Sequence, residues 1–328
     1  MKPERRLIYL AALLGVTVAA IVMPNIRAGD LGTPAAEPVA ATDPAPAAET
    51  EPLIKASELV QHTRPNALAL RSGVALVMDA REGVVLYERA ADTRRPIASL
   101  TKIMTALVIL EAGLPLDEPI EITRADRDRL RGSGSRIPFG AVLTRLELLH
   151  AALAASDNRA AAALARSHPG GTQAFVAAMN AKARSLGMEH TRFTDASGLG
   201  EGNVSTARDL ARLATAANAY PLIHDLTTST RFSVTDRHAG RDIEFLNTNR
   251  LVRGDRWDIE LSKTGYTAAA GNCLIMQTTI GERPVLIVLL NSWGKLSRYG
   301  DSQRIHDWLL RGERRALKSL DTVAGVQG

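Results

Sequence analysis

The sequence has few of the residues that build disulfides and metal sites. Its 328 residues include one cysteine, Cys273, so no disulfide can form within the chain. Cys273 lies in an apolar run, and we expect it to be a small buried hydrophobic residue. The seven histidines are scattered, without the spacing of metal ligands. We therefore predict no metal site and no cofactor.

Aromatic residues and net charge are also scarce. Aromatic side chains make up 4% of the chain, and the formal net charge is +5. This charge is too small and too dispersed to indicate nucleic-acid binding, although it suits an anionic polymer or surface. Apolar residues reach 45% and charged residues 23%, which excludes global disorder. The composition allows one large domain of roughly 250 residues, or two modest ones.

The N-terminus indicates export. Three basic residues among the first six precede an apolar stretch, 7–23, that contains no acid or base. Small residues at Ala28 and Gly29 provide a cleavage site. We predict that residues 1–28 are a signal peptide, with an N-terminal anchor that associates with the inner membrane as the alternative. The expected location is the periplasm.

The remaining chain divides into three parts by composition. Residues 29–52 are rich in proline and alanine and have no hydrophobic period, so we predict an extended linker. Residues 53–312 carry the periodic apolar patterns of a folded domain. Residues 313–328 are assigned to a C-terminal tail.

β-rich runs lie at both ends of this domain. Residues 74–79 and 84–89 are separated by the turn signal 81–83, which predicts a hairpin. Three more strands are expected near the end of the chain, at residues 259–264, 273–280 and 284–291, before a helix at about 302–310.

The middle of the domain is helical. A helical period runs from Ser99 to Gly113, and a second helix begins at Thr144, where Glu147 completes a capping box. We therefore predict an α+β fold, in which strands from both chain ends share one antiparallel sheet and a helical subdomain packs against it. The catalytic cleft is expected where the two parts meet.

The first segment with catalytic potential starts a helix. Ser99 and Lys102 are three residues apart, so they share one face of the helix and their side chains can meet. A serine needs a base to become a nucleophile, and a lysine can be that base only if its pKa is lowered. The helix start also offers free backbone N–H groups to a developing oxyanion.

Two further segments complete the pattern. At a break between helices, Ser156 can relay a proton to a leaving amine and Asn158 can hold a substrate carbonyl. The segment Lys263-Thr264-Gly265 lies on a predicted strand. Its lysine can lower the pKa of Lys102 and attract a substrate carboxylate. Gly265 lets a substrate backbone approach the strand closely.

Each segment alone has a plain structural explanation. Ser99 would be a helix N-cap, Lys102 a surface residue, and residues 156–158 a loop. The first two patterns arise by chance about once in a chain of this length, whereas Lys-Thr-Gly arises in roughly one chain in ten. All three together, in this order and on helix, loop and strand, match the motif set of penicillin-binding proteins and β-lactamases.

The chain resembles the low-molecular-mass penicillin-binding serine peptidases of the D-alanyl-D-alanine carboxypeptidase family, and within them the D-alanyl-D-alanine endopeptidases. The resemblance implies a β-lactamase/transpeptidase-like fold and extends from about residue 53 to residue 310. The stretches that carry it are residues 95–106, 180–188, 204–210, 247–249, 263–267 and 270–271.

The resemblance also implies roles for the motif residues. Ser99 would be the acylated nucleophile, Lys102 its base and Ser156 the proton relay. Asn158, Lys263, Thr264, Gly265 and Tyr266 would bind substrate, and the N–H groups of Ser99 and Tyr266 would form the oxyanion hole. The implied partners are the peptide stems of peptidoglycan, with β-lactams as covalent inhibitors.

Three functions remain open from the sequence. The first is an endopeptidase that hydrolyses D-alanyl cross-links, and the second is a carboxypeptidase that trims terminal D-alanine with the same residues. The two differ in the leaving amine, which the residues do not reveal. The third is a non-catalytic protein that binds β-lactams or the cell wall; Ser99, Lys102 and Lys263 together argue against it.

Overall fold

The computed structural model describes residues 54–326, with side chains as far as residue 320. The predicted signal peptide, residues 1–28, and the linker, residues 29–52, lie outside the described residues. In the described part, no helix is both long and apolar enough to span a membrane.

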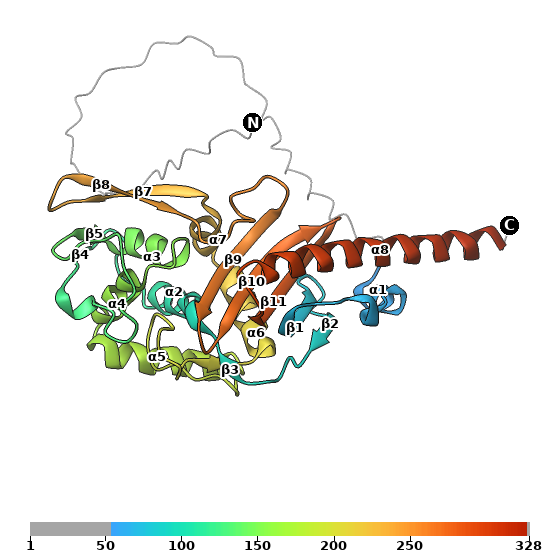
Figure 1. Ribbon diagram of the computed structural model, residues 1–328, viewed down its shortest axis with the longest axis horizontal. Helices are drawn as coiled ribbons and strands as arrows, with labels where there is room; N and C mark the ends of the chain where they lie inside the picture. Colours follow the sequence, from blue (N-terminus) through green and yellow to red (C-terminus); the bar gives the residue numbers. More distant parts are fainter. Residues whose placement is uncertain (1–53, 327–328) are drawn as a thin grey trace, which may run out of the picture. The chain divides into compact units, whose positions relative to one another are not determined.

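A five-stranded antiparallel sheet, ordered β2-β1-β11-β10-β9, forms the centre of the fold (Figure 1). The strands are β1 (Ser72–Asp79), β2 (Val85–Arg89), β9 (Asp258–Thr267), β10 (Gly271–Ile280) and β11 (Arg283–Ser292). The two ends of the domain meet where β1 pairs with β11, from Ser72 opposite Ser292 to Asp79 opposite Val285. This pairing confirms the predicted sheet, and the antiparallel β1–β2 pair confirms the predicted hairpin.

Both faces of the sheet are covered, which explains why its central strands are almost continuously apolar. Along β1, alternate residues point to opposite faces. Ala75 and Val77 belong to a core with Trp308, whereas Val74 and Leu76 belong to the larger core of the helical subdomain.

The described residues form eight α-helices. They are α1 (Ala56–His62), α2 (Thr101–Glu111), α3 (Arg145–Leu153), α4 (Asn158–Arg166), α5 (Gly171–Ser185), α6 (Ala207–Asn218), α7 (Pro221–Thr228) and α8 (Ser297–Val326). Helix α2 is buried along most of its length, which fixes the residues at its start. The predicted capping box at the start of α3 is confirmed, because Thr144 and Glu147 exchange both hydrogen bonds.

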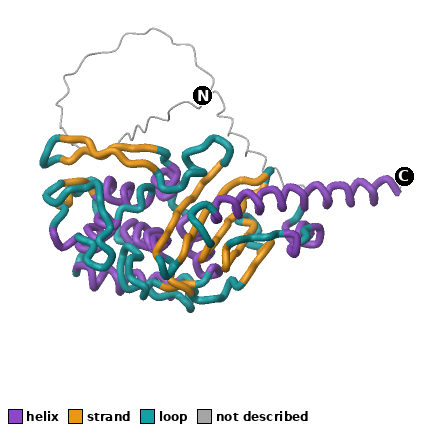
Figure 2. Tube along the Cα trace, in the orientation of Figure 1, coloured by secondary structure: helices purple, strands orange, loops and turns teal. Residues whose placement is uncertain are grey.

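Short elements complete the fold (Figure 2). Three two-stranded ribbons pair β3 (Arg95–Pro96) with β6 (Val204–Ser205), β4 (Pro119–Glu121) with β5 (Val142–Thr144), and β7 (Arg231–Asp236) with β8 (Arg241–Leu246). The 3₁₀ turns are η1 (Pro65–Ala67), η2 (Ala98–Leu100) and η3 (Arg124–Asp126). The sequence analysis identified none of these ribbons.

Helix α8 is longer than predicted at both ends. It begins at Ser297 instead of about residue 302, and it continues to Val326 through the residues assigned to a tail. Contacts extend beyond Gly312, since Ala316 is buried and Glu313 pairs with the buried Arg283 at 3.3 Å. These tertiary contacts support a segment that has no clear apolar period in the sequence.

Asp301 fastens α8 to the start of β1. Its carboxylate is fully buried and accepts hydrogen bonds from the backbone N–H of Arg71 at 3.0 Å and of Ser72 at 2.8 Å. The Ser72 hydroxyl donates to it at 2.6 Å. A buried carboxylate with several donors stabilises the fold, because removing it leaves those donors unsatisfied.

We expect Asp301→Ala to lower the free energy of unfolding by about 3 kcal/mol, because Ser72 loses an acceptor in a buried position. Urea denaturation of the full chain measures this change. Asp307→Ala on the same helix is the control and should cost less than about 0.5 kcal/mol, since that carboxylate is half-exposed. Equal losses in the two variants would contradict the assigned role of Asp301.

Candidate active site

Ser99 lies in the 3₁₀ turn η2, directly before α2. The preceding residue, Ala98, has a positive φ of 48°, which is unfavourable for a residue with a Cβ atom. The hydroxyl of Thr101 donates to the Ala98 carbonyl at 2.8 Å and holds this turn. Strain of this kind persists only where the surrounding structure imposes it, and it is common beside functional residues.

Lys102 is fully buried and places its amine against Ser99. The Nζ atom lies 2.9 Å from Ser99 Oγ, 2.7 Å from Asn158 Oδ1 and 2.8 Å from the carbonyl oxygen of Ser197. These three oxygen atoms come from three separate segments of the chain. The structure therefore brings together Ser99, Lys102 and Asn158, as the motifs predicted.

The hydrogen-bond partners of Asn158 fix the orientation of its amide group. Asp128 Oδ2 accepts the hydroxyl proton of Ser133 at 2.6 Å, so the Ser133 oxygen is free to accept from Asn158 Nδ2 at 2.9 Å. The opposite side of the amide, the acceptor Oδ1, then faces Lys102. The Ser197 carbonyl is likewise an acceptor only.

This arrangement directs the lone pair of a neutral Lys102 toward Ser99. A neutral amine has two N–H donors and one lone pair. Asn158 Oδ1 and the Ser197 carbonyl can only accept, so they take the two donors. The remaining partner, Ser99, can donate its hydroxyl proton, which is the geometry that a general base requires.

The protonation state of Lys102 agrees with this geometry. Burial lowers the pKa of Lys102 to about 7, although the negative charges of Asp157 and Asp195 act in the opposite direction. Near neutral pH a substantial fraction of the amine is therefore neutral. A surface lysine would remain protonated and could not accept a proton from a serine.

Lys263 lies on β9 and is also buried. Burial lowers its pKa well below the usual range, helped by the positive charges of Lys102 and Arg298. We expected Lys263 to lower the pKa of Lys102. Burial is the largest cause of the lowered pKa of Lys102, and the two buried lysines disfavour each other's charged form.

The neighbours of Lys263 define the strand beside Ser99. Lys263 Nζ donates to the Thr264 carbonyl at 3.1 Å, and the Thr264 hydroxyl lies 2.7 Å from that of Thr248. A Cβ atom on Gly265 would lie 3.1 Å from the backbone nitrogen of Ser99, so a larger residue would crowd the turn. Strand β9 is an edge of the sheet, which leaves one side available for an added strand.

Two of the predicted site residues, Tyr266 and Ser156, lie outside the hydrogen-bonded group formed by Ser99, Lys102 and Asn158. Tyr266 is 64% exposed, so only its backbone is held by the strand. Ser156 has a positive φ of 58° and lines a groove of about 460 Å³ with Phe245 and Leu246. Within residues 54–326, no hydrogen bond joins the Ser156 hydroxyl to Ser99 or Lys102.

Three residues that the sequence analysis did not single out support the site. The Asp195 carboxylate accepts from the backbone N–H groups of Ser197 and Gly198, each at 2.7 Å, and so shapes the loop that presents the Ser197 carbonyl. Gly198 has a φ of +81° and passes directly over the Ala98 carbonyl. The sequence Asp195-Ala-Ser-Gly has the composition of such a turn, but its contact with Lys102 is tertiary.

Arg298 is a further basic residue beside the end of β9. It lies half-buried in the first turn of α8, where Nη1 donates to the Gly265 carbonyl at 3.2 Å and to Asn272 Oδ1 at 2.9 Å. It thereby positions the end of β9. Its buried Nε atom has no partner among the described residues.

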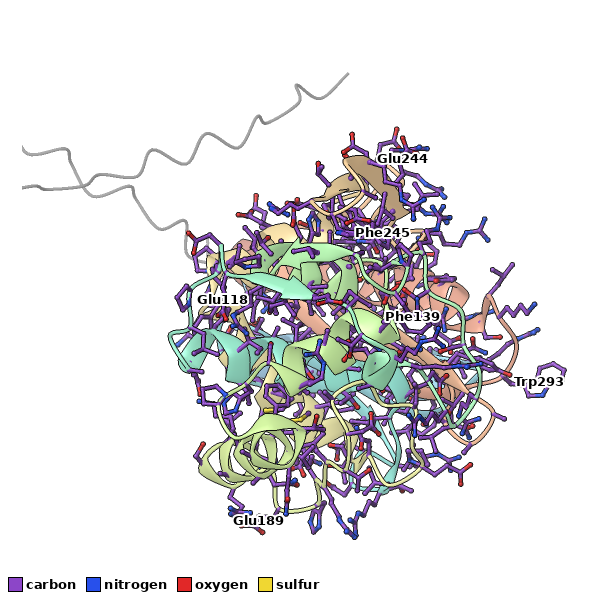
Figure 3. All side chains as sticks on the ribbon, turned by 90° about the vertical axis from the view of Figure 1, so that its left-hand side faces the viewer. Glu118, Phe139, Glu189, Glu244, Phe245 and Trp293 are labelled. Carbon is purple, nitrogen blue, oxygen red and sulfur yellow. The ribbon has the colours of Figure 1, made fainter. Side chains whose placement is uncertain are left out.

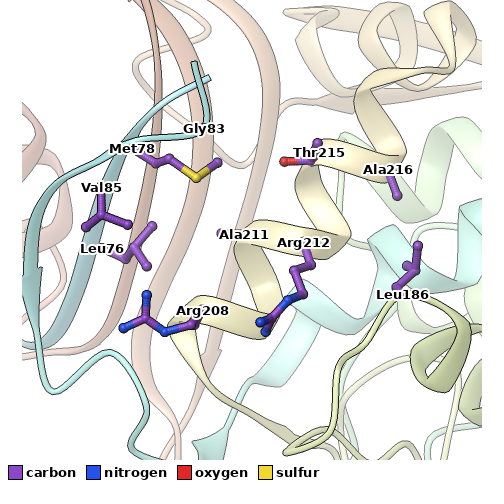
Figure 4. Close-up of a pocket in the computed structure, with 10 residues that line it drawn as sticks. All are labelled: Leu76, Met78, Gly83, Val85, Leu186, Arg208, Ala211, Arg212, Thr215 and Ala216. Carbon is purple, nitrogen blue, oxygen red and sulfur yellow. The ribbon is translucent and has the colours of Figure 1, made fainter. Parts of the chain in front are cut away.

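A separate apolar cavity of about 530 Å³ lies between α6 and strands β1 and β2 (Figure 4). Leu76, Met78 and Val85 line one side and Ala211 lines another. Its lining residues include no serine or lysine. The chemistry of acyl transfer therefore points to the group around Ser99.

Comparisons with known proteins agree with this chemistry. A family model described as D-alanyl-D-alanine carboxypeptidase matches residues 61–294. The chain is 47% identical to a D-alanyl-D-alanine endopeptidase of Pseudomonas aeruginosa over 258 residues, covering 79% of this chain and 83% of the relative. It is 44% identical to a D-alanyl-D-alanine endopeptidase of Escherichia coli over 244 residues, covering 74% of this chain and 79% of the relative.

A solved structure is similar as well. The DD-transpeptidase of Streptomyces K15 matches with a TM-score of 0.69 and 28% identity, over 74% of this chain and 98% of that chain. The likeness confirms the predicted α+β fold of the transpeptidase type.

We expect Gly198→Ala to destabilise the chain by at least about 3 kcal/mol, because the added Cβ would overlap the Ala98 carbonyl. Gly240→Ala is the matched control: its φ is also positive, at 61°, but the space around it is open, so only about 1 kcal/mol should be lost. Urea unfolding of both variants separates overlap from backbone strain. Similar losses would show that the close approach is not required.

Proposed function

The chain belongs to the D-alanyl-D-alanine carboxypeptidase family, and from this premise we propose that it is a serine endopeptidase that hydrolyses D-alanyl cross-links between the peptide stems of peptidoglycan. The contact of 2.9 Å between Lys102 Nζ and Ser99 Oγ carries the proposal of an acyl-enzyme mechanism. The choice of cross-links as substrate is supported by the relatives named endopeptidases.

In the acylation step, neutral Lys102 takes the hydroxyl proton of Ser99 while Oγ forms a bond to the D-alanyl carbonyl carbon. The carbonyl oxygen becomes an oxyanion, which the backbone N–H groups of Ser99 and Tyr266 stabilise. The C–N bond then breaks, and the leaving amine receives a proton through Ser156. Because Ser156 lines the groove, this relay requires the substrate to be bound.

In the second step, Lys102 takes a proton from a water molecule that attacks the ester carbonyl. The C–O bond to Ser99 breaks and the serine recovers its proton, so one water is consumed per bond cleaved. The substrate backbone would add to the edge of β9, with Asn158 holding a carbonyl. Lys263 and Thr264 would hold a carboxylate of the substrate or of a β-lactam.

The proposed location is the periplasm, where cross-linked peptidoglycan is present. The basic and apolar N-terminal sequence supports export, and retention of that segment would associate the protein with the inner membrane. A carboxypeptidase that removes terminal D-alanine is the second candidate, and the description of the matching family favours it.

Digestion of purified cross-linked muropeptide dimers tests the proposed substrate. We expect dimers to be converted to monomers, with the mass of one water added, and penicillin to block the conversion. Ser99→Ala should reduce the rate at least about 1,000-fold, because the nucleophile is lost, whereas the exposed Ser185→Ala should not change it. Removal of only a terminal D-alanine from intact dimers would establish the carboxypeptidase instead.

The pH dependence of acylation tests the role of Lys102. Since burial lowers its pKa to about 7, the neutral fraction increases with pH up to that value and then levels off. We expect the rate of penicillin acylation to rise about ten-fold per pH unit below 7 and to reach a plateau above it.

Two lysine variants provide the comparison for this profile. Lys102→Arg should reduce acylation by about 1,000-fold or more, because a guanidinium stays protonated. Lys182→Arg on α5, a surface residue paired with Glu111, should leave the profile unchanged. A flat profile, or a midpoint near the pKa of a free lysine, would reject Lys102 as the base.

A further inference from the structure

An arginine-rich segment begins in η3, runs toward β5 and borders a cavity of about 520 Å³. We name this the arginine cavity; its lining residues are Arg124, Arg127, Asp128, Arg129, Gly132 and Phe139. The three arginines are exposed. The mechanism proposed above uses none of them.

The carboxylates of this segment already have other partners. Asp126 is buried and accepts from Arg166 Nε at 2.7 Å and from Arg166 Nη2 at 2.9 Å. Asp128 accepts from the hydroxyl and the backbone N–H of Ser133, at 2.6 and 2.8 Å. Backbone N–H groups of Leu130 and Arg131 donate to it as well.

These contacts keep Asp128 ionised but directed into its own loop. Partial burial opposes its ionisation, yet the hydrogen bonds from Ser133 and from backbone N–H groups prevail and lower its pKa to about 2. In the part of the chain that the structure describes, the guanidinium groups of Arg124, Arg127 and Arg129 have no hydrogen-bond or ion-pair partner. The cavity therefore presents positive charge that is not neutralised by a bound carboxylate.

Two other arginines hold this segment in place. Arg131 Nε donates to the Leu199 carbonyl at 2.9 Å, and Arg136 Nη1 donates to the Glu244 carbonyl at 2.7 Å. They fasten the segment to the loop after Ser197 and to strand β8. The three unpaired arginines are thus carried by an anchored segment, which reduces the entropy lost when a ligand binds.

The arginine cavity adjoins the site around Lys102. Ser133 links them, because it donates to Asp128 in the cavity lining and accepts from Asn158, which contacts Lys102. Phe139 forms an apolar wall of the cavity and lies on the face of the molecule drawn in Figure 3. A substrate bound at Ser99 would extend into the cavity along the side of the site formed by Asn158 and Ser133.

We propose that the arginine cavity binds free carboxylates of the peptide stems that flank the scissile bond. The proposal rests on the proposed function, since such stems are acidic peptides held next to Ser99. A guanidinium matches a carboxylate with two parallel hydrogen bonds, and unlike a lysine it keeps its charge at all relevant pH values. The cavity would thus select substrates by the charge of the stem.

Binding to an inactive protein tests this proposal. Full-length Ser99→Ala is titrated calorimetrically with an acidic cross-linked dimer and with a dimer amidated at its stem side-chain carboxylates, its C-terminal carboxylate left free. We expect the acidic dimer to bind at least about ten-fold more tightly. Adding Arg127→Gln and Arg129→Gln should remove this preference while leaving the affinity for the amidated dimer unchanged.

A matched pair of substitutions controls for net charge. Arg184→Gln with Arg253→Gln removes the same charge from exposed positions outside the cavity lining and should keep the preference for the acidic dimer. Equal binding of the two dimers by the parent protein, or an unchanged preference in the Arg127 and Arg129 variant, would overturn the proposal.

The outcome is separable from that of the proposed function. If the wild-type chain did not cut dimers, the proposed endopeptidase activity would be wrong. The binding preference of the inactive protein would still decide the role of the cavity. If dimers were cut without any such preference, only the cavity proposal would fail.

Discussion

The site depends on one buried amine, that of Lys102, which has three oxygen partners. Removing a charged ammonium from water costs several kcal/mol, and Lys102 has no carboxylate in direct contact to offset this cost. Burial therefore lowers the pKa of the amine to about 7, which would allow it to act as the proposed base. Its orientation then depends on the two partners that can only accept, Asn158 Oδ1 and the Ser197 carbonyl. Each is fixed by a carboxylate further out, Asp128 for Asn158 and Asp195 for the Ser197 loop.

Backbone strain beside these residues is sustained by the packing around them. Ala98 and Ser156 are two of the four described non-glycine residues with positive φ, and they lie directly before Ser99 and at the break before α4. Helix α2 is buried on nearly all sides, so the turn that carries Ser99 cannot relax without disturbing the core. Gly198 adds to this constraint by crossing the Ala98 carbonyl. Local geometry that is unfavourable in isolation is thus held by the surrounding fold.

The sequence predicted the parts of the fold that depend on local patterns. The capping box of Thr144 and Glu147, the hairpin of β1 and β2 and the shared sheet all follow from short-range chemistry and apolar period. The contact of Ser197 with Lys102 could not be predicted, since a backbone carbonyl leaves no signature and the two residues are 95 positions apart. The length of helix α8 was underestimated because its later turns are supported by tertiary contacts, such as that of Glu313 with Arg283.

The cations around Ser99 divide into two groups with different physical roles. Burial removes charge from Lys102 and Lys263, so neither contributes fully to the attraction of an acidic ligand before it binds. A carboxylate bound beside Lys263 would raise the pKa of that lysine and favour its protonated form. Ligand binding and protonation of Lys263 would then be coupled. The arginines of the arginine cavity are exposed and keep their charge, so under the proposal they would supply the long-range attraction even though the net charge of the chain is only +5. In the proposed reaction the buried lysines would provide the chemistry, and the exposed arginines would provide the attraction that brings an acidic peptide to it.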